Sequence, residues 1–430
     1  MLPTIDRVIL EAAPGEARAV AFSGNEAWDI AIERPSDGPS EGDIYRARAG
    51  APGPDGGRFF DLGDGRVGLA RRVKPDWTEG AYGLVQILRG DAGEKGARVT
   101  DRVWLNQGGL SVSIGADGNK SDRVEISRSL PRAIRDEFRE RLEKNLPKGV
   151  AVRVLQALPG DVEAEVRAMS KFLNNLANTG GNPRQLHQAP GEIEQLAART
   201  RGATWIAADL VTNVWAASYG VTFAPPDQNV FAEIDSTISS ALERMVALTG
   251  GGTIWIDPTR ALTAIDVDSG SADIDSVNLI AAREIARQVR LRRLGGIIAI
   301  DFIRKNINPA LALLDELSRI DPWAWRAPHE VDAVGLASFQ RERRGQSLSN
   351  IATGVHACAL KSLKFASRNA RNGAAVIEAS GIIVDLLQGP LKPGLLEAER
   401  RVGRSLELKR SHNSDFVVIR DSGGKLLHEE

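Results

Sequence analysis

The sequence predicts an α/β protein of several domains, for three reasons. The chain has 430 residues, which is enough for about three domains. Residues 17–105 contain short apolar runs separated by turn residues, a pattern typical of a small β-barrel or sandwich. Residues 253–303 follow a strand, helix, strand order that is typical of an α/β sheet.

The first part of the chain is predicted to be rich in β-strands, with two helices after them. Gly, Pro and Asp residues interrupt the apolar runs, most strongly at the turn 52–57. The expected strands are 17–22, 27–32, 59–62 and 83–88, then two strands within 109–128 and one at 150–155. The expected helices are 131–146, with Pro131 near its first turn, and 163–178, which ends before Gly180.

The second part is predicted to alternate helices and strands. The expected helices are 230–248, 275–293 and 311–318, and the expected strands are 253–257, 261–267 and 297–303. The central helix repeats apolar residues every fourth position, at Val277, Ala281, Ile285 and Val289, so one face should be buried. The basic segment 349–375 is expected to be helical, and the last residues to form a small α/β domain.

Charge and composition exclude several classes of protein. Cys358 is the only cysteine, which excludes an internal disulfide and a paired-cysteine zinc site. The first 20 residues mix acidic and basic side chains, unlike a signal peptide, and no apolar run of about 18 residues exists. We therefore expect a cytoplasmic protein with no membrane partner.

A net charge of -1 argues against purely electrostatic binding of nucleic acid, so any such site must be a local basic patch. Candidate patches are Arg71, Arg72 and Lys74; Arg290, Arg292 and Arg293; Arg341, Arg343 and Arg344; and Lys361, Lys364, Arg368 and Arg371. Each patch taken alone is explained as well by a solvated surface.

Three carboxylates are candidates for chemistry. Asp266 and Asp268 are two residues apart at the end of an apolar strand, so they should share one face if the strand continues. Asp301 interrupts another apolar strand, where a carboxylate is costly without a cation or donors. If the strands are neighbours, Asp266 and Asp301 meet and suit Mg²⁺, which prefers oxygen ligands.

These residues also have a purely structural interpretation. A single Asp-x-Asp is often a surface turn or a helix cap, and an Asp at a strand end often bonds only to backbone. Spacing alone favours this interpretation over metal binding. Arg283, Arg287 and Arg290 lie on the polar side of the helix between the strands, where they could hold phosphates or be solvated.

Two long segments resemble the catalytic domain of the RNase E/G family. They are GGTIWIDPTRALTAIDVDSG (251–270) and NLIAAREIARQVRLRRLGGIIAIDFI (278–303). The resemblance implies a DNase I-like domain that uses Mg²⁺, with Mn²⁺ able to replace it, to cut single-stranded RNA. It places the metal on Asp266 and Asp301. The position of Asp268 is commonly an asparagine in the family, where it orients the attacking water or the phosphate.

The resemblance also implies a domain organisation. Residues 1–35 with 185–241 would form an RNase H-like domain, 36–105 an OB-fold, and 106–184 a domain that senses the RNA 5′-monophosphate. Residues 242–355 would form the DNase I-like domain, and 356–430 a linker and a small C-terminal domain. Residues expected to bind RNA are Phe59, Lys95, Arg128, Arg153, Arg290 and Arg343.

Several positions depart from the family pattern. The second aromatic of the OB-fold falls on Leu69, and Val154 replaces the threonine beside Arg153, so 5′ sensing should be weak or absent. After RRGQSL (343–348) the family carries two cysteines that share zinc across a dimer, whereas this chain has His356 and Cys358. We therefore expect no zinc, and a homodimer without a zinc link stays open.

The leading hypothesis is a Mg²⁺-dependent endoribonuclease in which Asp266, Asp268 and Asp301 are catalytic. The alternative is a non-catalytic RNA-binding protein derived from such a nuclease, since parts of the OB-fold and the sensor are altered. A phosphodiesterase that acts on another substrate is a third hypothesis.

Overall fold

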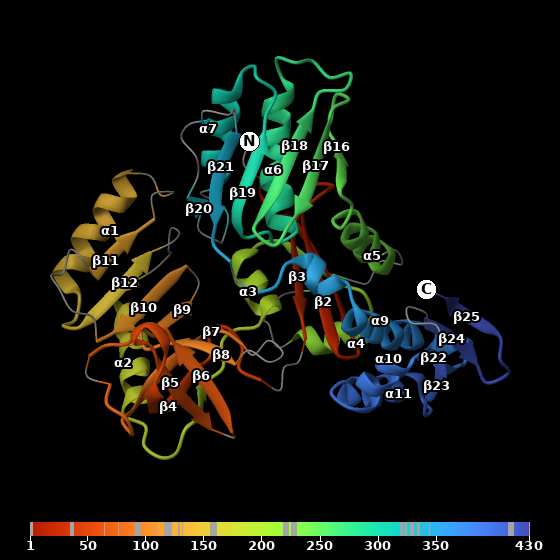
Figure 1. The fold of residues 1–430 in the computed structure, drawn as a ribbon, viewed down its shortest axis with the longest axis horizontal. Coiled ribbons are helices and arrows are strands. Elements are labelled where there is room, and N and C mark those ends of the chain that lie inside the picture. Colours follow the sequence, from red (N-terminus) through yellow and green to blue (C-terminus); the bar gives the residue numbers. More distant parts are fainter. Residues whose placement is uncertain are drawn as a thin grey trace. The chain divides into compact units, whose positions relative to one another are not determined.

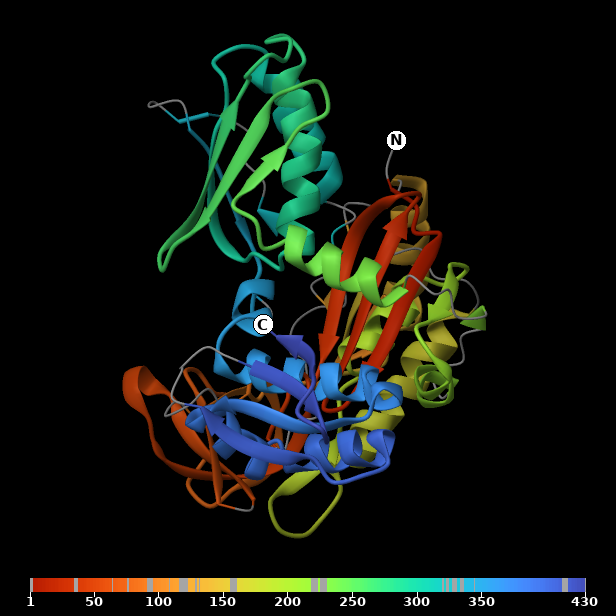
Figure 2. The same cartoon turned by 90° about the vertical axis from the view of Figure 1, so that its right-hand side faces the viewer.

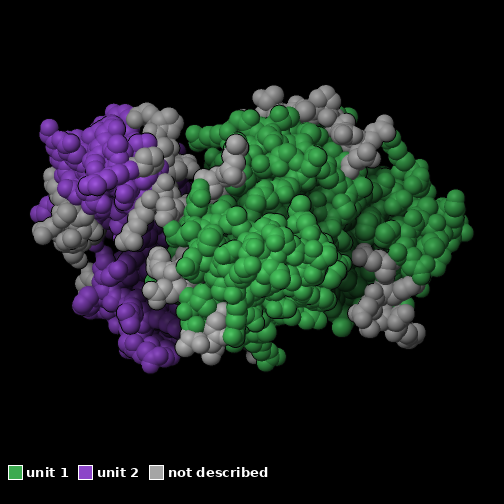
Figure 3. Space-filling view, turned by 90° about the horizontal axis from the view of Figure 1, so that it is seen from above, with its two compact units in different colours: residues 1–35, 191–430 green, residues 36–190 purple. Residues whose placement is uncertain are grey.

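The structure is a computed structural model (Figure 1). It describes residues 3–34, 38–63, 65–75, 77–90, 96–107, 109–115, 123–127, 130, 132–154, 161–217, 223–224, 230–318, 321, 325–326, 331–332, 336–343, 345–411 and 417–429. The chain divides into two compact units (Figure 3): unit 1 comprises residues 1–35 and 191–430, and unit 2 comprises residues 36–190.

Unit 2 contains a closed five-stranded barrel, which is consistent with an OB-like fold. Its strands are β4 (Ile44–Pro52), β5 (Arg58–Gly63), β6 (Arg66–Ala70), β7 (Tyr82–Arg89) and β8 (Ala97–Thr100), with a short 3-10 helix at Pro54–Gly56. The strand order is β4-β5-β6-β8-β7, and pairing of β4 with β7 closes it. Apolar side chains such as Phe60, Leu62 and Val85 fill the interior. A further strand, β13 (Arg184–His187), pairs with β4.

A second sheet of unit 2 carries two helices. Its strands are β9 (Trp104–Gln107), β10 (Leu110–Ile114), β11 (Val124–Ile126) and β12 (Val150–Val154), and its helices are α1 (Arg132–Asn145) and α2 (Val162–Ala177). The two strands predicted within 109–128 exist, but β12 lies between them in the order β11-β12-β10-β9. Leu142 of α1 and Leu173 of α2 belong to one core with Val112 of β10.

In unit 1, distant segments of the chain form the first sheet. Its strands are β1 (Arg7–Ala13), β2 (Glu16–Ser23), β3 (Glu26–Glu33), β14 (Thr204–Ala207) and β15 (Phe223–Ala224), in the order β15-β14-β1-β2-β3. The helices α3 (Glu192–Arg199), α4 (Leu210–Ala216) and α5 (Val230–Ser240) accompany it. β14 lies parallel to β1, although some 190 residues separate them.

The helix predicted over 230–248 was wrong in its second half. α5 ends at Ser240, and β16 (Met245–Ala247) is a strand that pairs with residues 253–255. Gly250 and Gly251 have φ values of 99° and 105°, so they form the turn between the two strands and do not end a helix. Pairing with a neighbouring strand outweighed the local helix propensity of this segment.

The second sheet of unit 1 has one face covered by helices and one face open (Figure 2). Its strands are β16, β17 (Thr253–Pro258), β18 (Leu262–Asp268), β19 (Gly296–Asp301), β21 (Leu336–Arg341) and β20 (Trp325–Arg326), in that order. Its helices are α6 (Val277–Leu291) and α7 (Ile307–Ser318). The repeat Val277, Ala281, Ile285, Val289 is fully buried against the sheet, as predicted.

The last part of unit 1 is a small α/β domain, as the sequence predicts. Its strands are β22 (Ala374–Ser380), β23 (Glu407–Ser411), β24 (Val417–Asp421) and β25 (Leu426–Glu429), in the order β23-β22-β24-β25. Its helices are α9 (Val355–Arg368), α10 (Gly381–Gln388) and α11 (Lys392–Val402), with a 3-10 helix at Ala370–Asn372. The preceding helix α8 (Leu348–Ala352) packs instead on the core of the first sheet. In the described residues, no helix is both long and apolar enough to cross a membrane.

Buried ion pairs hold the sheets of unit 1 in place. Asp29 of β3 accepts from Arg290 of α6 at 2.9 Å and lies 3.3 Å from Arg199 of α3. Arg341 of β21, which is 1% exposed, makes two 2.9 Å bonds to Asp321 and a 2.7 Å bond to the Leu294 carbonyl. Asp29, Arg341 and Asp321 are buried and Arg290 is largely buried, so the loss of one partner leaves a charge without compensation.

We expect Asp321→Asn to lower the free energy of unfolding by roughly 3–5 kcal/mol, because it leaves Arg341 buried without its carboxylate. Urea unfolding followed by circular dichroism measures this. Asp385→Asn, which breaks the exposed pair with Arg410, is the control and should cost about 1 kcal/mol or less. Equal effects of the two variants would contradict the assignment.

Stability should fall in acid partly through Asp29. Burial by itself raises the pKa of Asp29, but Arg290 and Arg199 outweigh burial and hold the pKa below its ordinary value. Such a carboxylate stabilises the fold above its unfolded pKa of about 4, and this stabilisation is lost as the pH falls through the folded pKa. Asp29→Asn should therefore be less stable than the wild type at neutral pH, and its stability should change less on acidification. Urea titrations at about pH 6 and about pH 3 measure this, and equal pH dependence would refute it.

Candidate functional site

Two carboxylates lie side by side on the open face of the second sheet of unit 1. β18 and β19 are parallel neighbours, and their register pairs Asp266 with Asp301. Neighbouring strands are about 4.8 Å apart, so the two side chains leave adjacent backbones on the same side. Both carboxylates are exposed. The residues next to them along the strands, Ile265, Val267 and Ile300, point to the opposite face, toward α6, and are buried. The sequence predicted this convergence, and the structure brings the two residues together.

The chemical surroundings of this pair suit a cation. Within the described part of the chain, the carboxylate of neither Asp266 nor Asp301 has a hydrogen bond or an ion pair to a protein group. Two like charges at facing positions of neighbouring strands repel each other, and a divalent cation would remove that cost. Mg²⁺ commonly takes one or two carboxylates and completes its shell with water and phosphate oxygens. The described residues contain no cluster of three or more His, Cys, Asp or Glu side chains that could enclose a metal. The donor set therefore fits an open site with two protein ligands.

Asp268 shares the open face but has a local bond. β18 extends to Asp268, so the alternation predicted from the sequence holds. Its Oδ1 accepts a hydrogen bond from the Gly270 N–H at 2.9 Å. This is the turn interaction that the structural interpretation of an Asp-x-Asp pair predicts.

The arginines of α6 are engaged by carboxylates of unit 1. Arg283 donates to Glu26, Arg287 to Glu284 and to the Ala27 carbonyl, and Arg290 to Asp29. Their first role is thus to attach α6 to the first sheet, which neither interpretation of the sequence included. Arg290, which was predicted to bind RNA, is largely buried in this arrangement.

Arg343 lies at the opposite end of β19 from the carboxylates. Its Nε donates to the Gly295 carbonyl at 3.1 Å, and its guanidinium covers Gly296, where an added Cβ would meet it at 2.4 Å. Asp301 is five residues further along β19, or roughly 16 Å at the usual rise of a strand. Arg343 is exposed, but the structure does not bring it to the carboxylate pair.

The barrel of unit 2 presents one of its two adjacent phenylalanines. Phe60 is buried against Trp77, whereas Phe59 is 38% exposed. Phe59 pairs in register with Leu69, which in turn pairs with Arg98. The two positions at which the family has aromatic residues are therefore direct neighbours here, and an arginine follows them on the next strand.

Arg98 was missed by the sequence analysis. Burial and the positive charges of Arg71 and Arg89 lower the pKa of Arg98, which reveals a local concentration of positive charge on the barrel. The only signal in the sequence is that Arg98 falls on an alternating strand. Its proximity to Arg71 could not be inferred, because it depends on the pairing of β8 with β6, which is not the neighbouring strand in the sequence.

The predicted sensor arginine lines a basic pocket of about 270 Å³ in unit 2, together with Lys74, Arg102, Arg123 and Trp104. Arg153 donates to Glu125 at 2.6 Å and its guanidinium lies 3.9 Å from the centre of the Trp104 ring. The adjacent Val154 is fully buried, so that position contributes nothing to the pocket. Two other predicted RNA-binding residues, Lys95 and Arg128, lie outside the described residues.

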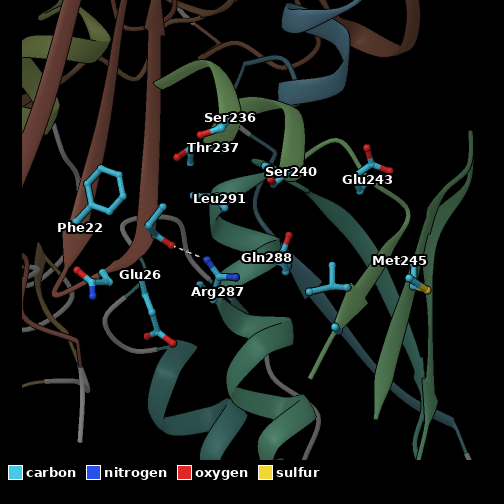
Figure 4. Close-up of a pocket in the computed structure, with 15 residues that line it drawn as sticks. Phe22, Glu26, Ser236, Thr237, Ser240, Glu243, Met245, Arg287, Gln288 and Leu291 are labelled. Atoms are coloured by element: carbon cyan, nitrogen blue, oxygen red, sulfur yellow. Dashed lines mark hydrogen bonds between the residues drawn. The ribbon is translucent and has the colours of Figure 1, made fainter. Parts of the chain in front are cut away.

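A second hollow, of about 490 Å³, was not predicted (Figure 4). It lies in unit 1 where α5, α6, β16 and the turn between β2 and β3 meet. Hydroxyl groups of α5 and Gln288 of α6 line it, and the bond from Arg287 to the Ala27 carbonyl crosses it. No signal in the sequence links these segments.

The residues at the position of the family's zinc cysteines are on α9. His356 is exposed and Cys358 is half-buried. Burial and the nearby Arg34 lower the pKa of His356.

Comparisons with known proteins point to a single family. A profile of the Ribonuclease E/G family matches residues 117–320. Ribonuclease E of Escherichia coli K12 is 29% identical over 82% of this chain and 38% of that protein. Ribonuclease E of Haemophilus influenzae is 31% identical over 69% of this chain and 37% of that protein. Ribonuclease G of Escherichia coli K12 is 24% identical over 80% of this chain and 81% of that protein.

The similarity thus covers most of this chain but less than two fifths of either ribonuclease E. The profile match includes the carboxylate pair and strands β16 to β19 of the sheet that carries it. By these matches, the chain is similar to the ribonuclease E/G family.

Proposed function

We propose that this chain is a metal-dependent endoribonuclease that hydrolyses phosphodiester bonds of single-stranded RNA. The observation that carries the proposal is the pairing of Asp266 with Asp301 on an open sheet face, without a cationic protein partner in the described residues. Similarity to a family whose relatives are named ribonucleases supports it.

Each residue has a distinct role in this proposal. Asp266 and Asp301 would hold Mg²⁺, or Mn²⁺ in its place, and the open face leaves room for water and a phosphate. The ion would polarise the scissile phosphate and lower the pKa of bound water. Asp268 is held by the Gly270 N–H and would position the nucleophile. The barrel, with Phe59 and Arg98, would hold the unpaired strand by stacking and by charge.

The finer assignments of fold belong to the same proposal. The sheet with Asp266 and Asp301 would be DNase I-like, the sheet formed by β1, β2, β3, β14 and β15 would be RNase H-like, and the barrel an OB-fold. The domain boundaries, the cytoplasmic location and a homodimer without a zinc link remain predictions.

A second candidate is an RNA-binding protein without catalysis. Leu69 on the barrel and the buried Val154 beside Arg153 favour it, because both remove groups that would contact RNA. The retained carboxylate pair favours catalysis, since an uncompensated pair on a sheet has no structural benefit.

Asp266→Asn and Asp301→Asn should each reduce Mg²⁺-dependent cleavage of an unstructured RNA by about 100-fold or more. Loss of a metal ligand removes several kcal/mol of charge stabilisation, and about 1.4 kcal/mol equals a factor of ten. RNA binding in EDTA should not change. Gel analysis of a labelled RNA measures the cleavage, and undiminished cleavage by either variant would sink the proposal.

Asp268→Asn is the matched control, because it removes one negative charge from the same strand and face. An asparagine Oδ1 can still accept the Gly270 N–H, so the turn should persist. We expect cleavage within about threefold of the wild type, which corresponds to less than about 1 kcal/mol. A loss as large as that of Asp301→Asn would show that the carboxylate of Asp268 itself is required.

Cleavage should depend little on the RNA 5′ end, because Glu125 engages Arg153. Glu125→Gln removes the competing carboxylate and should increase the preference for 5′-monophosphate over 5′-hydroxyl RNA by up to about fivefold, the value of an exposed ion pair. The ratio of initial cleavage rates on the two RNAs measures this. An unchanged ratio would indicate that Arg153 does not contact the 5′ end.

A further inference from the structure

A tryptophan lies directly beside the carboxylate pair. The register of five adjacent strands, β16, β17, β18, β19 and β21, places Met245, Trp255, Asp266, Asp301 and Leu336 in one row across the sheet. Trp255 is the strand neighbour of Asp266 on the side away from Asp301. One continuous surface therefore carries an apolar ring next to two acidic groups.

The backbone holds the indole of Trp255 on the open face. The residues before and after it, Ile254 and Ile256, are fully buried under α6, and alternation along β17 sends Trp255 to the opposite side. A rotation that buried the indole would have to expose both isoleucines. The position of the ring is thus fixed by the core of the sheet.

The indole of Trp255 is exposed and has no partner of its own. It is 40% exposed, and within the described part of the chain it has no hydrogen bond, no stacked ring and no cation above it. Other tryptophans are engaged: Trp28 and Trp205 are buried, Trp77 contacts Phe60, Trp104 lies under Arg153, and Trp325 stacks on Phe339. An exposed indole is unfavourable in water and is typical of a surface that binds a ligand transiently.

The distance from the carboxylates fits a nucleotide. Trp255 and Asp301 are two strand spacings apart, or roughly 10 Å. A nucleotide whose phosphate is bound by a metal ion at Asp266 and Asp301 has its base within this reach. Every nucleobase has a flat face that can stack on an aromatic ring, so such a contact tolerates any sequence.

We propose that Trp255 is a stacking platform for the unpaired base adjacent to the scissile phosphate, which a metal ion at Asp266 and Asp301 would bind. The inference rests on the proposed function and extends it to the form of the substrate. The base must leave any helical stack to reach the indole, so the platform selects unpaired nucleotides at the cleavage position. Trp255 is a positioning residue, because it would hold the RNA strand while the metal held by the carboxylates polarises the phosphate.

The test measures RNA affinity without metal, so that it does not depend on cleavage. The full chain in EDTA is titrated into a fluorescein-labelled, unstructured RNA of about ten nucleotides. Trp255→Ala should raise Kd about tenfold, as expected for the loss of one stacked base, and Trp255→Phe should stay within about threefold. Ile297→Ala is the matched control, because Ile297 is 50% exposed on the same face but four residues away from Asp301 on β19, and its Kd should not change.

A second measurement locates the contact directly. An RNA that carries one 5-iodouridine is irradiated with the wild type in EDTA, and the cross-linked peptide is identified by mass spectrometry. We expect the cross-link at Trp255. A cross-link elsewhere, an equal effect of Trp255→Ala and Ile297→Ala, or a Trp255→Phe variant as weak as Trp255→Ala would each overturn the proposal.

The experiment separates this inference from the proposed function. If the wild type binds RNA but does not cleave it with Mg²⁺, the nuclease assignment fails while the affinity and cross-linking results still decide the role of Trp255. If Trp255→Ala changes the molar mass in light scattering without RNA, the indole belongs to a contact between copies of the chain and the stacking role is refuted.

Discussion

The structure around the candidate site depends on the parallel pairing of β18 with β19. This pairing sets Asp266 opposite Asp301, and the same alternation buries Ile265 and Ile300 on the other face. A shift of one residue would send one carboxylate into the apolar core and one isoleucine into water. The hydrophobic core beneath the sheet therefore fixes the register, and the register creates the acidic pair. Trp255 is placed by the same constraint, because its strand shares the core.

Several arginines of unit 1 are bound to carboxylates or carbonyls within that unit. Arg283, Arg287 and Arg290 of α6 meet carboxylates or carbonyls of their own unit, and Arg341 meets Asp321. This leaves an open sheet face with acidic and apolar groups, which suits a metal and a base better than a bare phosphate. The cationic barrel surface around Arg98 in unit 2 has the complementary property. The net charge of -1 is thus compatible with RNA binding, since opposite charges occupy different surfaces.

The departures from the family pattern do not affect all parts of the chain equally. The barrel keeps Phe59 exposed but pairs it with Leu69, and the pocket around Arg153 lacks the hydroxyl at the buried Val154. The carboxylate pair is intact, with an aspartate at position 268 that bonds to its own turn. The departures therefore fall on groups proposed to bind RNA rather than on the groups proposed for the chemistry. Trp255 is an exposed aromatic side chain of unit 1, whereas Leu69 supplies none on the barrel.

The sequence by itself determined many of the helices and strands, the buried face of α6, and the identity of the two carboxylates. Apolar periodicity and turn residues are local signals, and the core enforces them. It failed where pairing between distant segments decided the outcome. Residues 245–247 form a strand because residues 253–255 pair with them. Arg98 is close to Arg71 as well as to Arg89 because β8 pairs with β6 in addition to β7. The ion pairs of Arg290 and Arg341, and the row that joins Trp255 to Asp301, were likewise decided only by the tertiary structure. Spatial neighbours depend on strand order and register, and those follow from packing of the whole unit rather than from any local stretch of sequence.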